Sequence, residues 1–480
     1  MLPANASPAV LDGDAPYRLL SDGRLLQTAG TLAVLDPATE QPVGQAPDCP
    51  PELLDATVLA GQAAFPAWAA RPLAERAACL VALGKAVEAN ADPLARLLTA
   101  EQGRPLAMAR QEVLTCVHWC RQVARMEQPV AEHTDPAGVR WETRRVPLGV
   151  VAAVVPWNFP LMIAVIKLAP ALLAGNTVIV KPSPFTPLAT LRLGELAAGI
   201  FPAGVLNVLS GGDALGPQLT AHAGIAKVSF TGSTATGRRV MASAASTLKR
   251  LTLELGGNDA AIVLPDVDVP RVAKKLFMGA FLNSGQICIA AKRIYVHESV
   301  YEAFAQAFAA IAGAAKVGPG ADERSLIGPV QNRPQYERVK ELVEATRAAG
   351  HRFIAGGELP AGPGYFIPPT VVDNPPDDAR VVVEEPFGPI VPLLRYADVD
   401  EAVRRANASE WGLGASVWSQ DVAQARAIAG RLQVGTVWIN TIHLLNPHAP
   451  FAGRKQSGLG VENGVEGLME FSAPQTLAVA

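Results

Sequence analysis

Cys288 and Glu254 are the residues whose types and spacing could carry a covalent reaction. Cys288 ends the stretch NSGQIC (283–288), and Glu254 begins the stretch ELGGN (254–258). A thiol can attack a carbonyl carbon, and a carboxylate can activate the water that breaks the resulting adduct. A single cysteine is more often a small apolar core residue, so the pair indicates catalysis only together with the motifs around it.

Asn158 is a candidate donor to a developing oxyanion. It lies in PWNFP (156–160), directly after a run typical of a buried strand. Open α/β sheets bind ligands beyond the carboxyl ends of their strands, where the amide of Asn158 could donate a hydrogen bond. The alternative is an asparagine that stabilises a turn between two prolines.

FTGSTATG (230–237) could form a turn that binds phosphate. It runs from an expected strand into an expected helix, whose unpaired N–H groups and dipole would face the anion, and Gly232 would allow close approach. Neither this stretch nor GGDALG (211–216) has the GxGxxG spacing of dinucleotide-binding turns. An ordinary strand-to-helix turn is therefore an equal alternative.

Composition limits the class of partner. The 480 residues are 49% hydrophobic and 18% charged, with a net charge of −3, so the chain lacks the basic field that gathers nucleic acid. Apolar runs such as 146–155 end well short of the roughly 20 residues of a membrane span. We expect neither nucleic acid nor membrane as a partner.

Five cysteines without the spacing of a disulfide framework, and a start (MLPANASPAV) unlike a signal peptide, favour the cytoplasm. Cys116, His118 and Cys120 lie close in sequence, but they make a weak metal site without a second pair of ligands. We expect structural packing there and no metal.

The elements that must position these residues change in character near residue 146. From 51 to 126 the apolar spacing predicts successive helices with breaks near Pro72, Pro93 and 103–105. Beyond 146, short β-branched runs alternate with helical stretches, which predicts an α/β fold of two tandem domains with parallel sheets covered on both faces. The segment 127–145 is expected to be a hairpin, and the C-terminal tail to end in an extended run.

Seven motifs in one order resemble the aldehyde dehydrogenase superfamily: PWNFP, KPSP, FTGSTATG, ELGG, GQIC, EEPFGP and PFAGRKQSG. The resemblance runs from about residue 20 to the C-terminus and implies the NAD(P)-dependent, hydrolytic oxidation of an aldehyde to an acid. It implies a Rossmann-like cofactor domain (1–126 and 146–256), a Rossmann-like catalytic domain (257–455) and a small β oligomerisation arm (127–145 and 456–480). A homodimer or homotetramer is expected.

The resemblance also assigns catalytic roles position by position. It implies that Cys288 is the nucleophile, Glu254 the general base and Asn158 the oxyanion donor. Lys167 and Glu462 match positions that relay protons outward, although each could be an ordinary member of a surface ion pair.

The same comparison implies the cofactor contacts. Lys181 is expected beside the adenosine ribose, Gly232 and Ser233 at the pyrophosphate, and Glu385 with Phe387 at the nicotinamide ribose. The further cofactor contacts expected are Trp157, Ser183, Gly211, Phe230, Leu255 and Gly256.

Pro184 is a departure from the family pattern. NAD-preferring members commonly carry a glutamate here, which holds both ribose hydroxyls and repels a 2′-phosphate. Its loss weakens selection for NAD and removes a penalty on NADP. Either cofactor is therefore expected, with NAD slightly favoured.

Apolar positions near the motifs indicate the substrate class. They are Trp157, Ile163, Ile166, Ile287, Ile289 and Leu444. If they line the substrate tunnel, they favour hydrophobic aliphatic, terpenoid or aromatic aldehydes, because burying a charged tail without a partner is costly. The alternative is that they are core residues without substrate contact.

Two other functions compete with hydrolytic oxidation. A CoA-acylating semialdehyde dehydrogenase would pass the thioester to a thiol and needs no general base, so Glu254 argues against it. A crystallin-like structural relative would have lost turnover, which the joint presence of Cys288, Glu254 and Asn158 disfavours.

Overall fold

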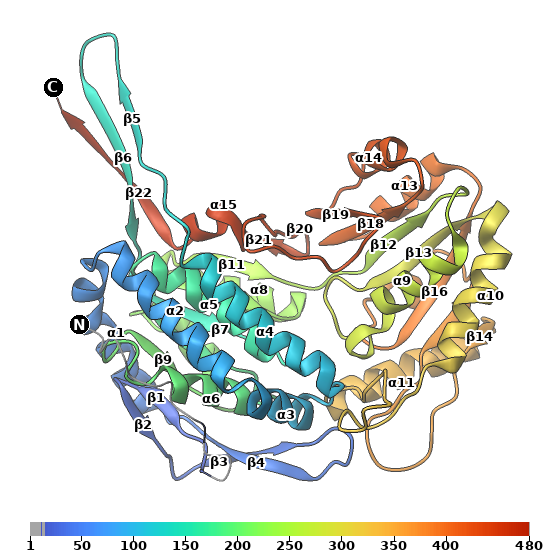
Figure 1. Cartoon of the computed structure of the whole chain (residues 1–480), viewed down its shortest axis with the longest axis horizontal. Helices are drawn as coiled ribbons and strands as arrows, with labels where there is room; N and C mark the ends of the chain where they lie inside the picture. The colour runs from blue at the N-terminus through green and yellow to red at the C-terminus, as the bar shows by residue number, and fades with distance from the viewer. Residues whose placement is uncertain (1–10, 12–14, 480) are drawn as a thin grey trace.

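The computed structural model describes residue 11 and residues 15–479. Two α/β units stand side by side, and a long β arm projects from the first of them (Figure 1). The predicted alternation of strands and helices is observed in both units, each built around an open and mainly parallel sheet. The first residues of the range 1–126 lie outside the described residues.

The first sheet contains eight strands, and its five central strands, from β9 to β11, are parallel. The central strands β7 and β8 are fully buried and rich in Val, Ile and Ala, as is typical of parallel strands covered on both faces. In spatial order the strands are β2 (Arg24–Leu26), β1 (Leu19–Ser21), β9 (Leu206–Val208), β8 (Thr177–Lys181), β7 (Val150–Val154), β10 (Lys227–Thr231), β11 (Arg250–Glu254) and β21 (Gly458–Leu459).

Helices cover both faces of this sheet. One face carries α1 (Pro51–Ala69), α7 (Leu215–Ala221) and α8 (Thr234–Ala244). The other carries α5 (Pro160–Leu173) and α6 (Leu188–Ala197), over which α2 (Leu73–Ala89), α3 (Ala91–Gln102) and α4 (Leu106–Val123) form a further layer.

Helix breaks lie near all three expected positions: near Pro72, near Pro93 and at 103–105. The second break is at Asn90, and Pro93 itself occupies the first turn of α3. A proline is tolerated there because the N–H groups of the first turn have no partner within the helix.

The second sheet has seven strands, with only the edge strand β14 antiparallel. The order is β14 (Phe353–Ala355), β15 (Thr370–Asp373), β16 (Ile390–Tyr396), β13 (Ala291–His297), β12 (Asp259–Val263), β18 (Gly414–Trp418) and β19 (Thr436–Ile439). One apolar layer includes α9 (Val269–Phe281) and α10 (Glu298–Ala314), and the other includes α11 (Arg333–Ala348), α12 (Arg380–Val383), α13 (Val399–Asn407) and α14 (Val422–Ala429).

The arm is a three-stranded antiparallel sheet of β5 (Ala131–Thr134), β6 (Arg140–Pro147) and β22 (Ser472–Val479). It joins the predicted hairpin to the C-terminal strand, which follows α15 (Gly464–Met469). Most residues of β5 and β22 are exposed. Smaller antiparallel pairs join β3 (Thr31–Leu35) to β4 (Pro42–Pro47) and β17 (Trp411–Gly412) to β20 (Arg454–Lys455).

No helix in the described part of the chain is long and apolar enough to cross a membrane.

Candidate active site

The strand order of the first sheet reverses between β7 and β10, and this switch point is where open α/β sheets bind ligands. The PWNFP loop follows β7, the turn 231–233 follows β10, and Glu254 ends β11. The loop after β7, the turn after β10 and the residues that follow Glu254 line a cavity of about 120 Å³, together with Cys288, helix α11 and the loop around Glu385 of the second unit. Its lining residues are Pro156, Trp157, Asn158, Thr231, Gly232, Ser233, Leu255, Gly256, Cys288, Gln335, Arg338, Glu385 and Phe387.

Cys288 is partly exposed and follows a tight turn in which Asn283, Ser284 and Gly285 all have positive φ (52°, 57° and 70°). A Cβ at Gly285 would lie 2.3 Å from the carbonyl oxygen of Gly388, so only glycine fits this close approach. Non-glycine residues with positive φ are strained, and the surrounding structure must hold them in place. Such strained backbone is common at functional sites.

The electrostatic surroundings of the thiol do not favour the thiolate. Burial raises the pKa of Cys288, and the nearby carboxylates of Glu254, Asp259 and Glu385 raise it further. A nucleophilic cysteine commonly has a lowered pKa, but burial and the protein's own charges act in the opposite direction here. The thiol must therefore lose its proton to a base or ionise beside a bound cation.

Glu254 is 4% exposed and carries an unusual carboxylate. Within the described chain, neither of its oxygens accepts a hydrogen bond. Burial raises its pKa well above the usual range and Glu462 raises it further, whereas Lys167 lowers it. A buried carboxyl group without a partner has free lone pairs for water, as a general base requires.

Lys167 and Glu462 form an ion pair whose atoms Nζ and Oε1 lie 2.5 Å apart. Lys167 Nζ also donates to Ser229 Oγ at 3.0 Å. Their side chains are 0% and 9% exposed, so the alternative of an ordinary ion pair at the surface does not apply. Their influence on the pKa of Glu254 places them beside the candidate base.

Asn158 is 3% exposed, and its amide Nδ2 donates to the carbonyl oxygen of Gln286 at 3.1 Å. This acceptor lies two residues before Cys288, so the hydrogen bond ties the PWNFP loop to the cysteine loop. The second hydrogen of the amide is free of this bond, and Asn158 shares the cavity lining with Cys288.

The turn after β10 has the features of an anion site. Ser233 is the N-cap of the 11-residue helix α8, with its side chain accepting from the Thr236 N–H at 3.2 Å. A Cβ on Gly232 would lie 2.5 Å from the ring of Phe230, so this position requires glycine. The free N–H groups and the dipole of α8 therefore face the cavity, as a pyrophosphate would need.

Glu385 and Phe387 lie on the opposite wall of the cavity. Glu385 Oε1 accepts from the Gly257 N–H at 2.9 Å, and burial raises the pKa of this carboxyl to about 7. The ring of Phe387 meets that of Trp157 edge to face, with centroids 5.3 Å apart. These residues link the two units across the site.

Gln335 and Arg338 also line the cavity, although the sequence did not indicate them. Gln335 Nε2 donates to the carbonyls of Pro386 and Phe387 at 3.0 Å, and Arg338 donates to that of Glu385 at 2.9 Å. They lie on α11, outside the quoted motifs, and their spacing of three residues on a helix is the one signal that could have paired them.

Lys181, Ser183 and Gly211 do not line this cavity but lie farther along the same edge of the sheet, after β8 and β9. Burial lowers the pKa of Lys181 to about 8, although Asp213 and Asp48 oppose the shift. Its Nζ donates to the carbonyl of Pro182 at 3.1 Å. A dinucleotide that crosses the switch point extends in this direction.

Cys288 packs against an apolar cluster. Ile287, Ile289 and Phe451 are buried within it, and Phe159, Leu282 and Leu445 pack against it. Ile163 and Ile166 belong to the core of the first unit. Leu444, expected at the site, has 68% of its surface exposed, whereas its neighbour Leu445 packs inward. His443 precedes them with a positive φ of 61°, a turn geometry that apolar spacing does not predict.

Cys116 and Cys120 are fully buried in α4, and burial raises the pKa of both thiols. No cluster of three metal-ligating side chains occurs among the residues that the structure describes.

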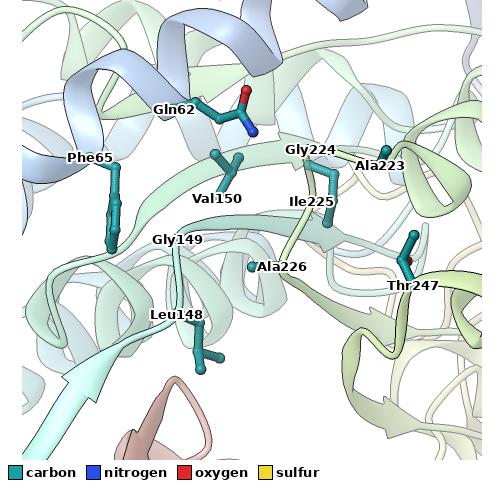
Figure 2. Close-up of a pocket in the computed structure, with 10 residues that line it drawn as sticks. All are labelled: Gln62, Phe65, Leu148, Gly149, Val150, Ala223, Gly224, Ile225, Ala226 and Thr247. Carbon is teal, nitrogen blue, oxygen red and sulfur yellow. The ribbon is translucent and has the colours of Figure 1, made fainter.

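A second cavity, of about 460 Å³, lies at the amino ends of β7 and β10 (Figure 2). Gly149 and Ala226, which precede these strands, line it together with Gln62 and Phe65 of α1. None of the predicted site residues is in its lining, which contains no titratable side chain. It is on the opposite edge of the sheet from the ligand-binding edge and offers no group for catalysis.

Comparisons with known proteins agree with this geometry. The family model described as "Aldehyde dehydrogenase family" matches residues 26–477. The chain belongs to the aldehyde dehydrogenase family. It is 43% identical over 473 residues to a probable aldehyde dehydrogenase of a Pseudomonas species, covering 98% of this chain and 96% of the relative.

It is 39% identical over 498 residues to the phenylacetaldehyde dehydrogenase of Pseudomonas fluorescens, covering 100% of this chain and 99% of that protein. The solved structure of an aldehyde dehydrogenase from Bacillus cereus with NAD+ superposes with a TM-score of 0.94, at 34% identity and with 97% of each chain covered. The expected family and fold class are thereby confirmed.

The protein is therefore an enzyme that oxidises aldehydes, and its family uses NAD or NADP. The residues present fit such a cofactor, because a capped helix N-terminus, a glycine at the close approach and a buried carboxylate all border one cavity.

Proposed function

We propose that this aldehyde dehydrogenase oxidises apolar aldehydes to carboxylic acids by the hydrolytic route, with Cys288, Glu254 and Asn158 as its catalytic residues. One observation carries the proposal. Cys288 and Asn158 line the same cavity as the α8 turn, and the unpartnered carboxyl of Glu254 is close enough to affect the thiol.

Cys288 Sγ attacks the aldehyde carbon and gives a thiohemiacetal, whose oxyanion accepts hydrogen bonds from the Asn158 amide and from a backbone N–H at the nucleophile. A bound nicotinamide supplies the acceptor for the hydride that leaves this carbon. A water molecule, which gives a proton to Glu254, then attacks the thioester carbon, and the carbon–sulfur bond breaks to release the carboxylic acid and the Cys288 thiolate. Lys167 and Glu462 carry that proton away from the base.

The protein supplies orientation and water control in this cycle. Glu385, Phe387 and Trp157 hold the nicotinamide end, the Gly232–Ser233 turn holds the pyrophosphate, and Lys181 with Ser183 and Gly211 takes the adenosine end. Leu255 and Gly256 line the cavity between them, and the ring of Phe230 packs beside Gly232. In this assignment the first sheet is the cofactor domain and the second the catalytic domain.

The apolar cluster around Cys288 supports aliphatic, terpenoid or aromatic aldehydes as the substrate class. A charged tail would lose its hydration there without gaining a partner. The similarity to phenylacetaldehyde dehydrogenase is consistent with an aromatic aldehyde.

NAD is favoured slightly over NADP as the cofactor. The half-buried Pro184 cannot chelate the ribose hydroxyls, but Asp213 and Asp48 set negative charge beside Lys181, which disfavours a 2′-phosphate.

The arm is proposed to build a homodimer or homotetramer. Its three strands project from the body, and its exposed apolar side chains include Val130, Trp141, Leu477 and Val479. Strands that expose apolar side chains and free edges are typical of surfaces that pair with another chain. Light scattering with Leu477→Asp tests this assignment, with a smaller assembly as the expected result.

An assay of reduced nicotinamide that crosses a panel of aldehydes with both cofactors, with and without CoA, tests the proposed function. We expect acid formation without CoA from apolar aldehydes. An acyl-CoA product would establish the CoA-acylating alternative. No reduction of either cofactor, together with failure of iodoacetamide to label Cys288, would support the non-catalytic, crystallin-like alternative.

A further inference from the structure

A buried ion pair lies directly beneath the loop that carries Asn158. Arg104 stands in the break between α3 and α4, Glu112 lies on α4, and their side chains are 0% and 1% exposed. Removing two charges from water costs several kcal/mol per ion unless further hydrogen bonds satisfy both groups. The partners of these two side chains therefore indicate what the pair holds in place.

Arg104 contacts the PWNFP loop through its guanidinium group. Its Nη1 contacts Glu112, its Nη2 donates to the main-chain carbonyl of Asn158, and its Nε donates to Gln102 Oε1 at 2.7 Å. The guanidinium carbon also lies 4.3 Å from the ring centroid of Phe159, a cation–π distance. One side chain thus fixes two consecutive residues of PWNFP.

Glu112 contacts the start of α5, which directly follows the PWNFP loop. Its Oε1 accepts from the backbone N–H groups of Leu161 and Met162 at 3.0 and 2.9 Å, and its Oε2 contacts Arg104. These N–H groups lie in the first turn of α5, where no partner within the helix is available. The carboxylate thus takes the place of an N-cap and fixes the start of α5 relative to Arg104.

The carbonyl of Asn158 has a second donor, Asn283 Nδ2 at 3.2 Å, which belongs to the cysteine loop. With its carbonyl held on both sides, Asn158 can move its amide only through its two side-chain torsions. An oxyanion donor must lie within a few tenths of an ångström of its position, and an error of about 1 Å can cost roughly 100-fold in rate.

We propose that Arg104 and Glu112 are positioning residues that place the Asn158 amide at the oxyanion formed on Cys288. The proposal rests on the proposed function of Asn158. Lysine cannot replace Arg104, because its single ammonium group lacks the planar fork that reaches Glu112, Gln102 and the Asn158 carbonyl together.

A double-mutant cycle of Arg104→Lys with Asn158→Ala tests the proposal. The rate of reduced-cofactor formation is measured in a single turnover with saturating aldehyde and cofactor. We expect Arg104→Lys to lower this rate by about 10- to 30-fold when Asn158 is present, and by less than about 3-fold when it is alanine. Iodoacetamide labelling of Cys288 and the cofactor Kd should stay within about 2-fold of wild type, which a general loss of structure would not allow.

Arg121→Lys is the matched control, because Arg121 lies on α4 with Glu112 and its ion pair with Glu88 is exposed, at 43% and 48%. It should leave the single-turnover rate unchanged. Equal losses from Arg104→Lys in the two Asn158 backgrounds, or a folded Arg104→Lys with the wild-type rate, would overturn the positioning role.

If Arg104→Lys does not fold, Glu112→Gln takes its place in the same double-mutant cycle. The glutamine oxygen can still accept from the two N–H groups, whereas the substitution removes the negative charge that pairs with Arg104. Failure of the proposed function is distinguishable from failure of the positioning role. If Asn158 is not the oxyanion donor, Asn158→Ala by itself leaves hydride transfer at the wild-type rate. If Asn158 is the donor but Arg104 does not position it, Asn158→Ala lowers the rate and the effects of the two substitutions are additive.

Discussion

Replacing Glu254 by glutamine should separate the two halves of the reaction. Glutamine keeps the shape of the side chain but cannot accept a proton, so acylation of Cys288 should continue while hydrolysis of the thioester slows. General-base catalysis contributes about 10²- to 10⁴-fold, and Glu254 is 4% exposed with both oxygens free of protein donors, so water has few other bases to use. We expect steady-state turnover to fall by about 100-fold or more.

The assay is stopped-flow absorbance of the reduced nicotinamide. Glu254→Gln should give a rapid burst of about one reduced cofactor per active site, followed by a slow phase. Cys288→Ala should remove both phases, and Glu466→Gln, at an exposed position of α15, should leave both unchanged. A steady-state rate for Glu254→Gln equal to that of wild type would refute the role of Glu254 as general base.

The raised pKa of Glu254 gives the same variant a pH signature. Only the ionised carboxylate accepts a proton, so wild-type kcat should rise with pH through this raised pKa, and Glu254→Gln should lose that limb. The unfolded chain ionises near the ordinary value of 4.5, whereas burial keeps the folded carboxyl protonated. The wild type therefore loses stability relative to the variant as pH rises above about 4.5, which thermal melts at several pH values can measure.

Three further predictions involve four other substitutions. Glu462 raises the pKa of Glu254 and Lys167 lowers it, so Glu462→Gln should move the acid limb of the kcat profile to lower pH and Lys167→Met to higher pH; shifts in the same direction would contradict this arrangement. Leu445→Ala should lower kcat/KM about 10-fold for long aliphatic aldehydes and little for acetaldehyde, and an equal loss for both would remove Leu445 from the substrate pocket. Pro184→Glu should raise the ratio of the NADP Kd to the NAD Kd by about 10-fold or more in fluorescence titrations, and an unchanged ratio would mean that the ribose does not bind beside residue 184.

The fold class followed from local sequence because strand and helix periods depend on neighbouring residues. Buried parallel strands must be apolar on both faces, so runs such as β7 and β8 were recognisable without tertiary contacts. Short edge pieces were not recognisable. β21 has two residues and joins the first sheet only because β11 offers it a free edge, which no local pattern records.

The motifs indicated Cys288, Glu254 and Asn158 as candidate catalytic residues, because chemistry requires a residue type at a strand end or turn, and both are visible in sequence. Their electrostatics were decided by tertiary structure. Burial raises the pKa of the Cys288 thiol, and the carboxylates of Glu254, Asp259 and Glu385 raise it further; both effects come from segments that only the fold brings together.

Sequence alone thus determined the fold class and the family and indicated candidate reacting groups, since these depend on periodicity and on motif order. Tertiary structure decided that Leu445 packs against the apolar cluster beside Cys288 while Leu444 is exposed, that Gln335 and Arg338 line the cavity, and that Arg104 and Glu112 contact the Asn158 loop. The physical reason is that burial and hydrogen-bond partners arise from contacts between segments far apart in the chain, and residue spacing carries no information about them.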